Sequence, residues 1–402
     1  MSGMNSDRLA RIGTFLQERY IGPGKLPMAD FMVARNGEQV YRTTLGTSRA
    51  DGSPLRDDAI YRIASMTKPI TSITFMQLVE EGKVALDDRV SRIIPEFADL
   101  GAYNGGGGAM PFAPVKPCAP MRMVDLMSHM SGLTYGFQNR SSVDAAYRKT
   151  LPDGDRTIAG FDHFIAELSK LPLEFAPGTG WNYSVSTDVL GVIISRVEKK
   201  SLGEVFRERI FDPLGMHDTG FHLAEADRDR LTDSWAFNPG KPPKLIEKAT
   251  ESDLTTPARF EGGGGGLLST TADYHRFCQM LIGQGERDGV RIISPKTLDL
   301  MTRNQLPGGT DLADISQSLF SETSYDGVGF GLGFAITLDT ARALVPGSAR
   351  EFFWGGLHST SFFIDPVEKL HMVFMTQLTP PSEPTRRQLK TLVYSAIDKS
   401  YA

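Results

Sequence analysis

The sequence predicts an α+β fold, in which an antiparallel sheet flanked by helices adjoins a mostly helical second lobe. β-rich segments lie near both ends of the chain, and apolar helical segments fill its middle. Asn36-Gly37 joins two β-rich runs, and this dipeptide is typical of a type I′ hairpin turn, whose two central residues need positive φ. We therefore expect one antiparallel sheet built from both ends of the chain.

The composition excludes several classes of protein. The chain has 402 residues, of which 40% are hydrophobic and 23% charged, so it can bury a large core. Its net charge of −5 argues against a nucleic-acid-binding surface. No apolar run reaches the roughly 20 residues of a membrane span, and no signal peptide is visible, which predicts a cytoplasmic protein. Cys118 and Cys278 are expected to be free thiols.

The N-terminal elements follow from hydrophobic spacing. Residues 1–20 predict an amphipathic helix. Its apolar stripe comprises Leu9, Ile12, Phe15 and Leu16. A hairpin over residues 31–46 and a short strand over 59–63 come next. Residues 65–81 are apolar on most sides, which indicates a buried helix, and Gly82 can end it in the left-handed conformation.

The remaining segments continue the pattern. Further helices are expected over residues 123–133, 161–171 and 186–200, with a long glycine- and proline-rich loop over 105–120. Residues 328–338 predict one strand, 351–356 another, and 361–377 two strands joined by a turn at Asp365-Pro366. Residues 384–399 predict a closing amphipathic helix. Its core-facing residues would be Leu389, Leu392, Val393 and Ile397.

These elements suggest two lobes. Residues 1–64 and 262–402 would form a discontinuous sheet domain, and residues 65–261 a mostly helical domain inserted into it. A cleft between lobes is a usual place for a ligand site.

A serine and a lysine stand three residues apart at the start of the buried helix. Ser65 and Lys68 share one helical face, and the helix N-terminus favours negative charge that develops on the serine. Burial favours a neutral lysine, which can then accept the serine proton. By spacing alone, an N-terminal capping serine followed by a solvated lysine is the better interpretation of the pair.

Two further segments add groups with possible catalytic roles. Tyr183, in a Tyr-Ser-Val triplet before an apolar helix, is a possible proton shuttle or else a core tyrosine. Trp354-Gly355-Gly356 lies on a predicted strand. Glycines weaken a strand unless something approaches its backbone closely, and a substrate carbonyl is one such group. A bulge or bend is the alternative.

Together these segments resemble the serine β-lactamase and penicillin-binding protein superfamily, and most of all the family VIII carboxylesterases, which are similar to class C β-lactamases. Further phrases share the resemblance. They are DLMSHMSGL, FAPGTGWNYS, FDPLGMHDTGF and GGGGGLLSTTADYHRF. The resemblance spans residues 31–377 and implies the β-lactamase/transpeptidase fold.

The resemblance also implies residue roles. Ser65 would be the nucleophile, Lys68 the base and Tyr183 the proton relay. The backbone N–H groups of Ser65 and Leu357 would form the oxyanion hole. The expected substrate-binding residues are Tyr135, Val185, Trp354, Gly355, Gly356 and His358. No metal or other cofactor is expected, and the partner would be a small-molecule ester.

The chain departs from the class C pattern at two positions. Val185 stands where class C β-lactamases carry the Asn of Tyr-x-Asn, and Trp354 where they carry the Lys of Lys-Thr-Gly. Loss of a cation and gain of an indole favours neutral, apolar acyl groups. We therefore expect a serine carboxylesterase acting on small to medium esters.

Other functions stay open at this point. An acyltransferase of the same fold, a β-lactamase or D-aminoacyl peptidase, and a non-catalytic binding homologue are the alternatives. A conventional α/β-hydrolase is disfavoured because the chain has no G-x-S-x-G. The glycine runs 105–108 and 262–266 are not followed by Lys-Ser/Thr, so neither is a phosphate-binding loop. Oligomeric state cannot be read from the sequence.

Overall fold

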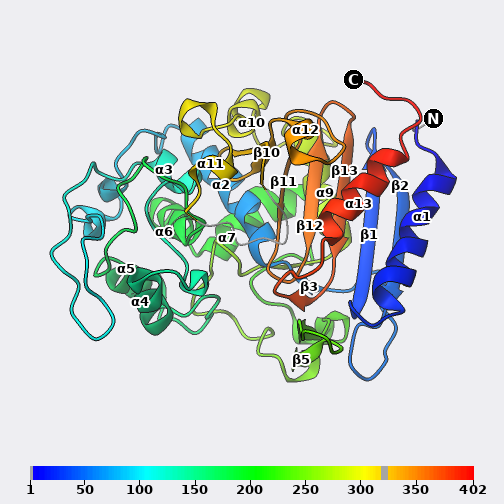
Figure 1. Cartoon of the computed structure of the whole chain (residues 1–402), viewed down its shortest axis with the longest axis horizontal. Coiled ribbons are helices and arrows are strands. Elements are labelled where there is room, and N and C mark those ends of the chain that lie inside the picture. The colour runs from blue at the N-terminus through cyan, green and yellow to red at the C-terminus, as the bar shows by residue number, and fades with distance from the viewer. Residues whose placement is uncertain (1–2, 318–324) are drawn as a thin grey trace.

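A seven-stranded antiparallel sheet forms one side of the molecule in the computed structural model, which describes residues 3–317 and 325–402. The strand order is β2-β1-β13-β12-β11-β10-β9. The strands are β1 (Met28–Arg35), β2 (Glu38–Gly46), β9 (Val328–Phe330), β10 (Ala335–Thr337), β11 (Phe352–Gly355), β12 (Ser361–Asp365) and β13 (Leu370–Met375). N-terminal and C-terminal strands pair between β1 and β13, so the predicted sheet from both ends of the chain is confirmed (Figure 1).

The turn predicted at Asn36-Gly37 is confirmed, but one predicted strand proves to be two. Asn36 and Gly37 have φ of 56° and 82°, as a type I′ turn requires. The prediction of a single strand over residues 328–338 was wrong, because two strands, β9 and β10, pair there as a hairpin. Gly333 lies at its turn with φ of 94°. A Cβ at Gly333 would lie 2.2 Å from Ser72 Oγ, so the turn packs directly on a helix of the other lobe.

Helices cover the sheet. α1 (Ser6–Leu16) and α13 (Thr385–Ser395) pack against each other in front of it (Figure 1), and α9 (Thr271–Ile282) contacts β1, β12 and β13. Every residue of these three strands is buried, so both of their faces are covered.

The two terminal helices differ slightly from the prediction. α1 begins at Ser6 rather than at the chain start, because the side chain of Asn5 accepts a hydrogen bond from Arg8 N and caps the helix. The prediction for residues 1–2 lies outside the described residues. In α13, Leu389 and Val393 are buried and Leu392 is half-buried. Ile397, also half-buried, lies beyond the end of the helix at Ser395.

The helical lobe is built around α2 (Thr67–Glu80). It packs against α6 (Ser186–Glu198), which in turn contacts α3 (Met123–Met127) and α7 (Leu202–Phe206). All residues of α2 from Thr67 to Leu78 are buried, which confirms the predicted buried helix, and Gly82 follows it with φ of 69°. The other helices are α4 (Ser142–Thr150), α5 (Phe161–Leu168), α8 (Asp212–Leu214), α10 (Pro295–Met301), α11 (Leu312–Ile315) and α12 (Thr340–Ala343).

Several short strands lie outside the large sheet. β3 (Tyr61–Arg62) pairs with β6 (Leu268–Ser269), not with the large sheet, and thereby fixes the segment just before α2. The other short strands are β4 (Ser234–Ala236), β5 (Lys244–Glu247), β7 (Glu286–Arg287), β8 (Val290–Arg291) and β14 (Leu378–Thr379). No described helix has the length and apolar character needed to cross a membrane. The domain boundaries given above stay a prediction.

A buried arginine joins the two ends of the chain. Arg35 at the end of β1 is fully buried. Its guanidinium donates to the carbonyl oxygens of Gly3 at 3.1 Å, Glu368 at 3.0 Å and Lys399 at 2.8 Å. It also forms an ion pair with the Glu368 carboxylate at 2.5 Å. Both termini therefore lie together at one end of the molecule (Figure 1).

Candidate active site

Ser65 lies at the wall of a cavity of about 410 Å³. It is part of a 3₁₀ turn, Ala64–Met66, that leads directly into α2. Ala64 has φ of 44°, a conformation that is strained for a residue with a Cβ and is frequent at functional sites. The turn leaves the Ser65 side chain half-exposed at the cavity, while Met66 and the helix behind it are buried.

Lys68 lies one helical turn behind Ser65 and is 2% exposed. Its Nζ donates to Ser65 Oγ at 3.2 Å, to Tyr135 OH at 2.9 Å and to Gly264 O at 2.6 Å. The predicted meeting of hydroxyl and amine on one helical face is therefore present, and the lysine is not solvated.

Tyr183 contacts the same lysine through its ring. Lys68 Nζ lies 4.6 Å from the ring centroid of Tyr183, a distance at which a cation is attracted to the aromatic face. The phenol oxygen of Tyr183 accepts a hydrogen bond from Trp354 Nε1 at 3.3 Å. Ser65 and Tyr183 thus line one cavity, and Lys68 contacts both of them from behind its wall.

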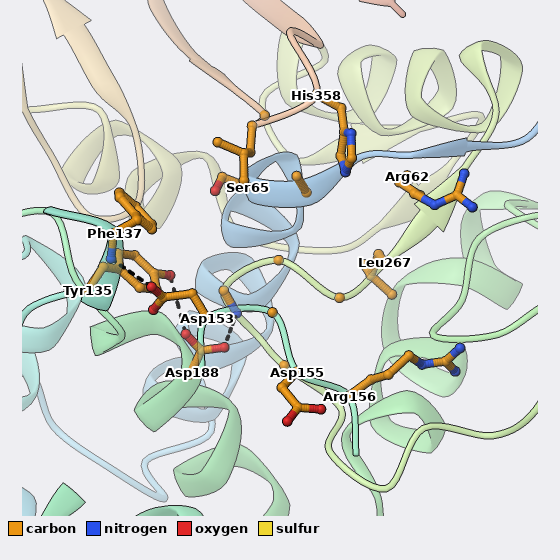
Figure 2. Close-up of a pocket in the computed structure, with 18 of the residues that line it drawn as sticks. Arg62, Ser65, Tyr135, Phe137, Asp153, Asp155, Arg156, Asp188, Leu267 and His358 are labelled. Carbon is orange, nitrogen blue, oxygen red and sulfur yellow. Dashed lines mark hydrogen bonds between the residues drawn. The ribbon is translucent and has the colours of Figure 1, made fainter. Parts of the chain in front are cut away.

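The phenol that is hydrogen-bonded to Lys68 belongs to Tyr135, which the sequence suggested only as a pocket wall. Its OH donates to Asp188 Oδ2 at 3.3 Å (Figure 2). Burial and the nearby charge of Asp188 raise the pKa of Tyr135 well above its usual value, so its phenol stays protonated. Asp188 Oδ1 accepts from Gly264 N at 2.9 Å. Burial raises the pKa of Asp188, and the charge of Lys68 opposes this shift.

Close packing against the backbone requires a glycine at position 356 of the Trp-Gly-Gly triplet. A Cβ at Gly356 would lie 2.5 Å from Ile63 O, whereas one at Gly355 would meet only the movable guanidinium group of Arg386, at 2.5 Å. The end of β11 therefore lies directly against the turn that carries Ser65. This contact brings Leu357, the next residue, to the same cavity wall.

The other predicted residues also line the cavity. Val185 and Trp354 are 6% and 8% exposed, and both contribute to its wall together with His358. Burial and the charge of Arg62 lower the pKa of His358 to about 3, so its imidazole is neutral at physiological pH. Its Nδ1 lies 3.4 Å from Ser234 Oγ. Among residues 3–317 and 325–402, no His, Cys, Asp and Glu side chains cluster in a way that could hold a metal ion.

Residues 17–395 match the family model described as Beta-lactamase. The chain belongs to the Beta-lactamase family.

Similar proteins include esterases. Esterase EstB of Burkholderia gladioli is 30% identical over 364 residues, which cover 86% of this chain and 84% of EstB. Lovastatin esterase of Penicillium rubens is 31% identical and covers 81% of each chain. In structure, EstCE1, described as a hydrolase with promiscuous acyltransferase activity, aligns with a TM-score of 0.79 at 23% identity, covering 98% and 99% of the two chains. The expected family and fold are confirmed.

Within this Beta-lactamase family member, three groups around Lys68 were missed by sequence reasoning. They are the hydroxyl of Tyr135, the carbonyl of Gly264 and the carboxylate of Asp188. Two signals were present in the sequence. Asp188 follows Tyr183 closely, in the first turn of an apolar helix, and Gly264 lies in the five-glycine run 262–266.

Proposed function

We propose that the protein is a serine carboxylesterase that hydrolyses small to medium carboxylic esters through an acyl-enzyme on Ser65. The observation that carries the proposal is the 3.2 Å contact between Lys68 Nζ and Ser65 Oγ at the wall of a largely apolar cavity. An amine within hydrogen-bond distance of a hydroxyl can activate it as a nucleophile.

The reaction proceeds in two steps. Ser65 Oγ attacks the ester carbonyl carbon while Lys68 accepts the hydroxyl proton. The N–H groups of Ser65 and Leu357 donate to the developing oxyanion. The bond to the leaving oxygen then breaks, and a proton relayed through Tyr183 converts the alkoxide to the alcohol. Water next attacks the acyl carbon and gives a proton to the same groups. The bond between this carbon and Ser65 Oγ then breaks, the proton returns to Ser65 Oγ, and the carboxylic acid leaves.

The walls of the cavity favour neutral substrates. Val185 and Trp354 offer apolar surface where class C enzymes have an amide and a cation, so they provide no charged partner for a β-lactam carboxylate. The relatives named as esterases support this preference. We therefore expect turnover of p-nitrophenyl acetate and butyrate, and much weaker turnover of nitrocefin.

A variant of the nucleophile tests the proposal. Ser65→Ala should abolish p-nitrophenyl butyrate hydrolysis, and a fluorophosphonate probe should label the Ser65 peptide of the wild type. Tyr183→Phe should lower kcat by about 10²- to 10⁴-fold if the phenol relays the proton. Ser169→Ala, at a serine just after α5 and outside the cavity, is the matched control and should keep full activity. Retained activity in Ser65→Ala, or labelling of another residue, would refute the assignment.

Acyl transfer is the second candidate, favoured by the structural likeness to EstCE1. It shares every step up to the acyl-enzyme, after which an alcohol replaces water. Adding an acceptor alcohol to the p-nitrophenyl butyrate assay and measuring the new ester by mass spectrometry distinguishes the two. Ester formation that exceeds acid release would assign the protein as an acyltransferase.

A further inference from the structure

The five-glycine run 262–266 passes between α2 and α6, and no side chain fits at Gly263 or Gly264. A Cβ at Gly264 would lie 2.4 Å from Asp188 Oδ2 and 2.8 Å from Tyr135 OH, and one at Gly263 would lie 2.8 Å from Thr187 O. The backbone of the run is also anchored to α2, because Thr71 Oγ1 donates to Gly263 O at 2.7 Å. Because these glycines have no side chains, the main chain of the run can lie directly against Asp188 and Tyr135.

Four groups form a closed ring of hydrogen bonds behind Ser65. Asp188 accepts from Gly264 N at 2.9 Å and from Tyr135 OH at 3.3 Å. Lys68 Nζ donates to the oxygens of the same two residues, at 2.6 Å to Gly264 O and at 2.9 Å to Tyr135 OH. Figure 2 shows Asp188 below Tyr135, with its carboxylate turned towards both the phenol and the glycine run.

The donors and acceptors of this ring determine how Lys68 is oriented. An ionised carboxylate can only accept, so Tyr135 must direct its proton to Asp188 and present its oxygen to Lys68. The carbonyl of Gly264 likewise only accepts. Two of the Lys68 N–H bonds therefore point at these oxygens. The third tetrahedral position, which holds a proton in the ammonium and a lone pair in the neutral amine, points at Ser65.

We propose that Asp188 is a positioning residue that fixes the lone pair of neutral Lys68 on the hydroxyl of Ser65. It acts through Tyr135 and the backbone of Gly264 and does not contact the substrate. This inference rests on the proposed function, because it assigns Lys68 as the base for Ser65. It also gives the glycine run a role, since Gly264 supplies both a donor to Asp188 and an acceptor for Lys68.

Replacing the carboxylate by an amide of the same shape tests the ring. In Asp188→Asn, the amide oxygen can still accept from Gly264 N, but the NH₂ group now donates to the Tyr135 oxygen. Tyr135 must then turn its proton towards Lys68, where it competes with Ser65 for the lone pair. The maximal rate of p-nitrophenyl acetate hydrolysis should fall by about 10²-fold or more, the size typical for loss of base catalysis.

The split between kcat and KM separates positioning from loss of structure. Because Asp188 does not contact the substrate, Asp188→Asn should lower the plateau of kcat and the rate of fluorophosphonate labelling while KM keeps its wild-type value. Asp273→Asn is the matched control. Asp273 is also a buried aspartate in the first turn of a helix, bonded to Asp218 N and Thr219 Oγ1, and it does not line the cavity. This variant should be less stable but should keep the wild-type kcat and KM.

Tyr135→Phe provides a second variant if Asp188→Asn does not fold, as judged by circular dichroism. It removes the phenol through which Asp188 orients Lys68, and it should lower the plateau of kcat as Asp188→Asn does. A folded Asp188→Asn or Tyr135→Phe enzyme with the wild-type plateau of kcat overturns the inference alone. Absence of Ser65 labelling in the wild type would instead overturn the proposed function, and the inference with it.

Discussion

At the scale of single residues, the spacing of the site depends on Gly356. It donates from its backbone to Thr360 O at 2.8 Å, and its Cα faces Ile63 O so closely that no side chain fits. The chain therefore turns sharply at the end of β11, next to Ser65. This close approach was anticipated from the sequence as room for a substrate, whereas the contact is with the protein itself.

Gly356→Ala tests whether the close contact between the end of β11 and the turn that carries Ser65 fixes the geometry of the site. Its new Cβ would lie 2.3 Å from Thr360 Oγ1 and 2.5 Å from Ile63 O, so the end of β11 must move away from the turn carrying Ser65. Loss of one oxyanion donor lowers kcat by about 10²- to 10³-fold, and we expect a fall of this size for p-nitrophenyl butyrate. Gly180→Ala is the control, because its nearest neighbour would be at 3.4 Å. A folded Gly356→Ala enzyme with wild-type kcat would contradict this account.

Local spacing predicted some contacts of the site and not others. Ser65 and Lys68 are three residues apart on one helical face, so their contact follows from helix geometry. Tyr135 and Tyr183 both follow loops far from Lys68 in the sequence, and no periodicity says which phenol bonds to the amine. Only tertiary packing decides it, and the structure gives that bond to Tyr135.

At the scale of elements, strong local signals were read correctly. The turn at Asn36-Gly37 requires positive φ at both residues, and α2 has apolar residues on most sides. The division of residues 328–338 into two strands was missed, because glycines 329, 331 and 333 alternate with apolar residues as in a single strand. The turn there depends on Gly333 fitting against Ser72 on α2, which is a long-range contact.

Two histidines join α9 to the sheet and should make the protein sensitive to acid. His275 Nδ1 and His371 Nε2 lie 2.8 Å apart, so one imidazole donates and the other accepts, and both are neutral. Burial lowers the pKa of His275 to about 4 and that of His371 to about 3. The unfolded chain, with histidine pKa values near about 6.5, binds more protons below that pH. Stability is therefore full above about pH 6.5 and falls as the pH drops towards 4.

The double variant His275→Gln/His371→Gln should show a flatter dependence of unfolding free energy on pH between 6.5 and 4. Each proton taken up on unfolding contributes about 1.4 kcal/mol per pH unit. Urea denaturation at pH 8, 6 and 5 measures the slope. His163→Gln, at an exposed position of α5, should leave it unchanged. A double variant with the wild-type slope would show that the pair does not titrate as described.

At the scale of the whole molecule, the sheet unites the two ends of the chain, and Arg35 secures them. Arg35→Met should lower the free energy of unfolding by about 3–5 kcal/mol, because it leaves the 3% exposed Glu368 without its cationic partner. Arg8→Met removes an exposed contact with Asp398 and should cost about 1 kcal/mol or less. Urea denaturation measures both, and kcat should be unchanged in both because the cavity lies elsewhere. Equal losses of unfolding free energy in the two variants would contradict the larger contribution assigned to Arg35.

The carbonyl oxygens of Gly3 and Lys399 accept hydrogen bonds from the same guanidinium, so the two ends of the chain lie close together. The order of the elements along the sequence can therefore be changed while each element keeps its place in the fold. A short linker between the ends would close the backbone into a circle. Cutting that circle in the exposed loop around Gly108, which Figure 1 shows at the far end of the molecule, gives a circular permutant that retains every contact at Ser65. Its new termini would emerge from the helical lobe, so a fusion partner or an immobilisation tag could be moved from one end of the enzyme to the other.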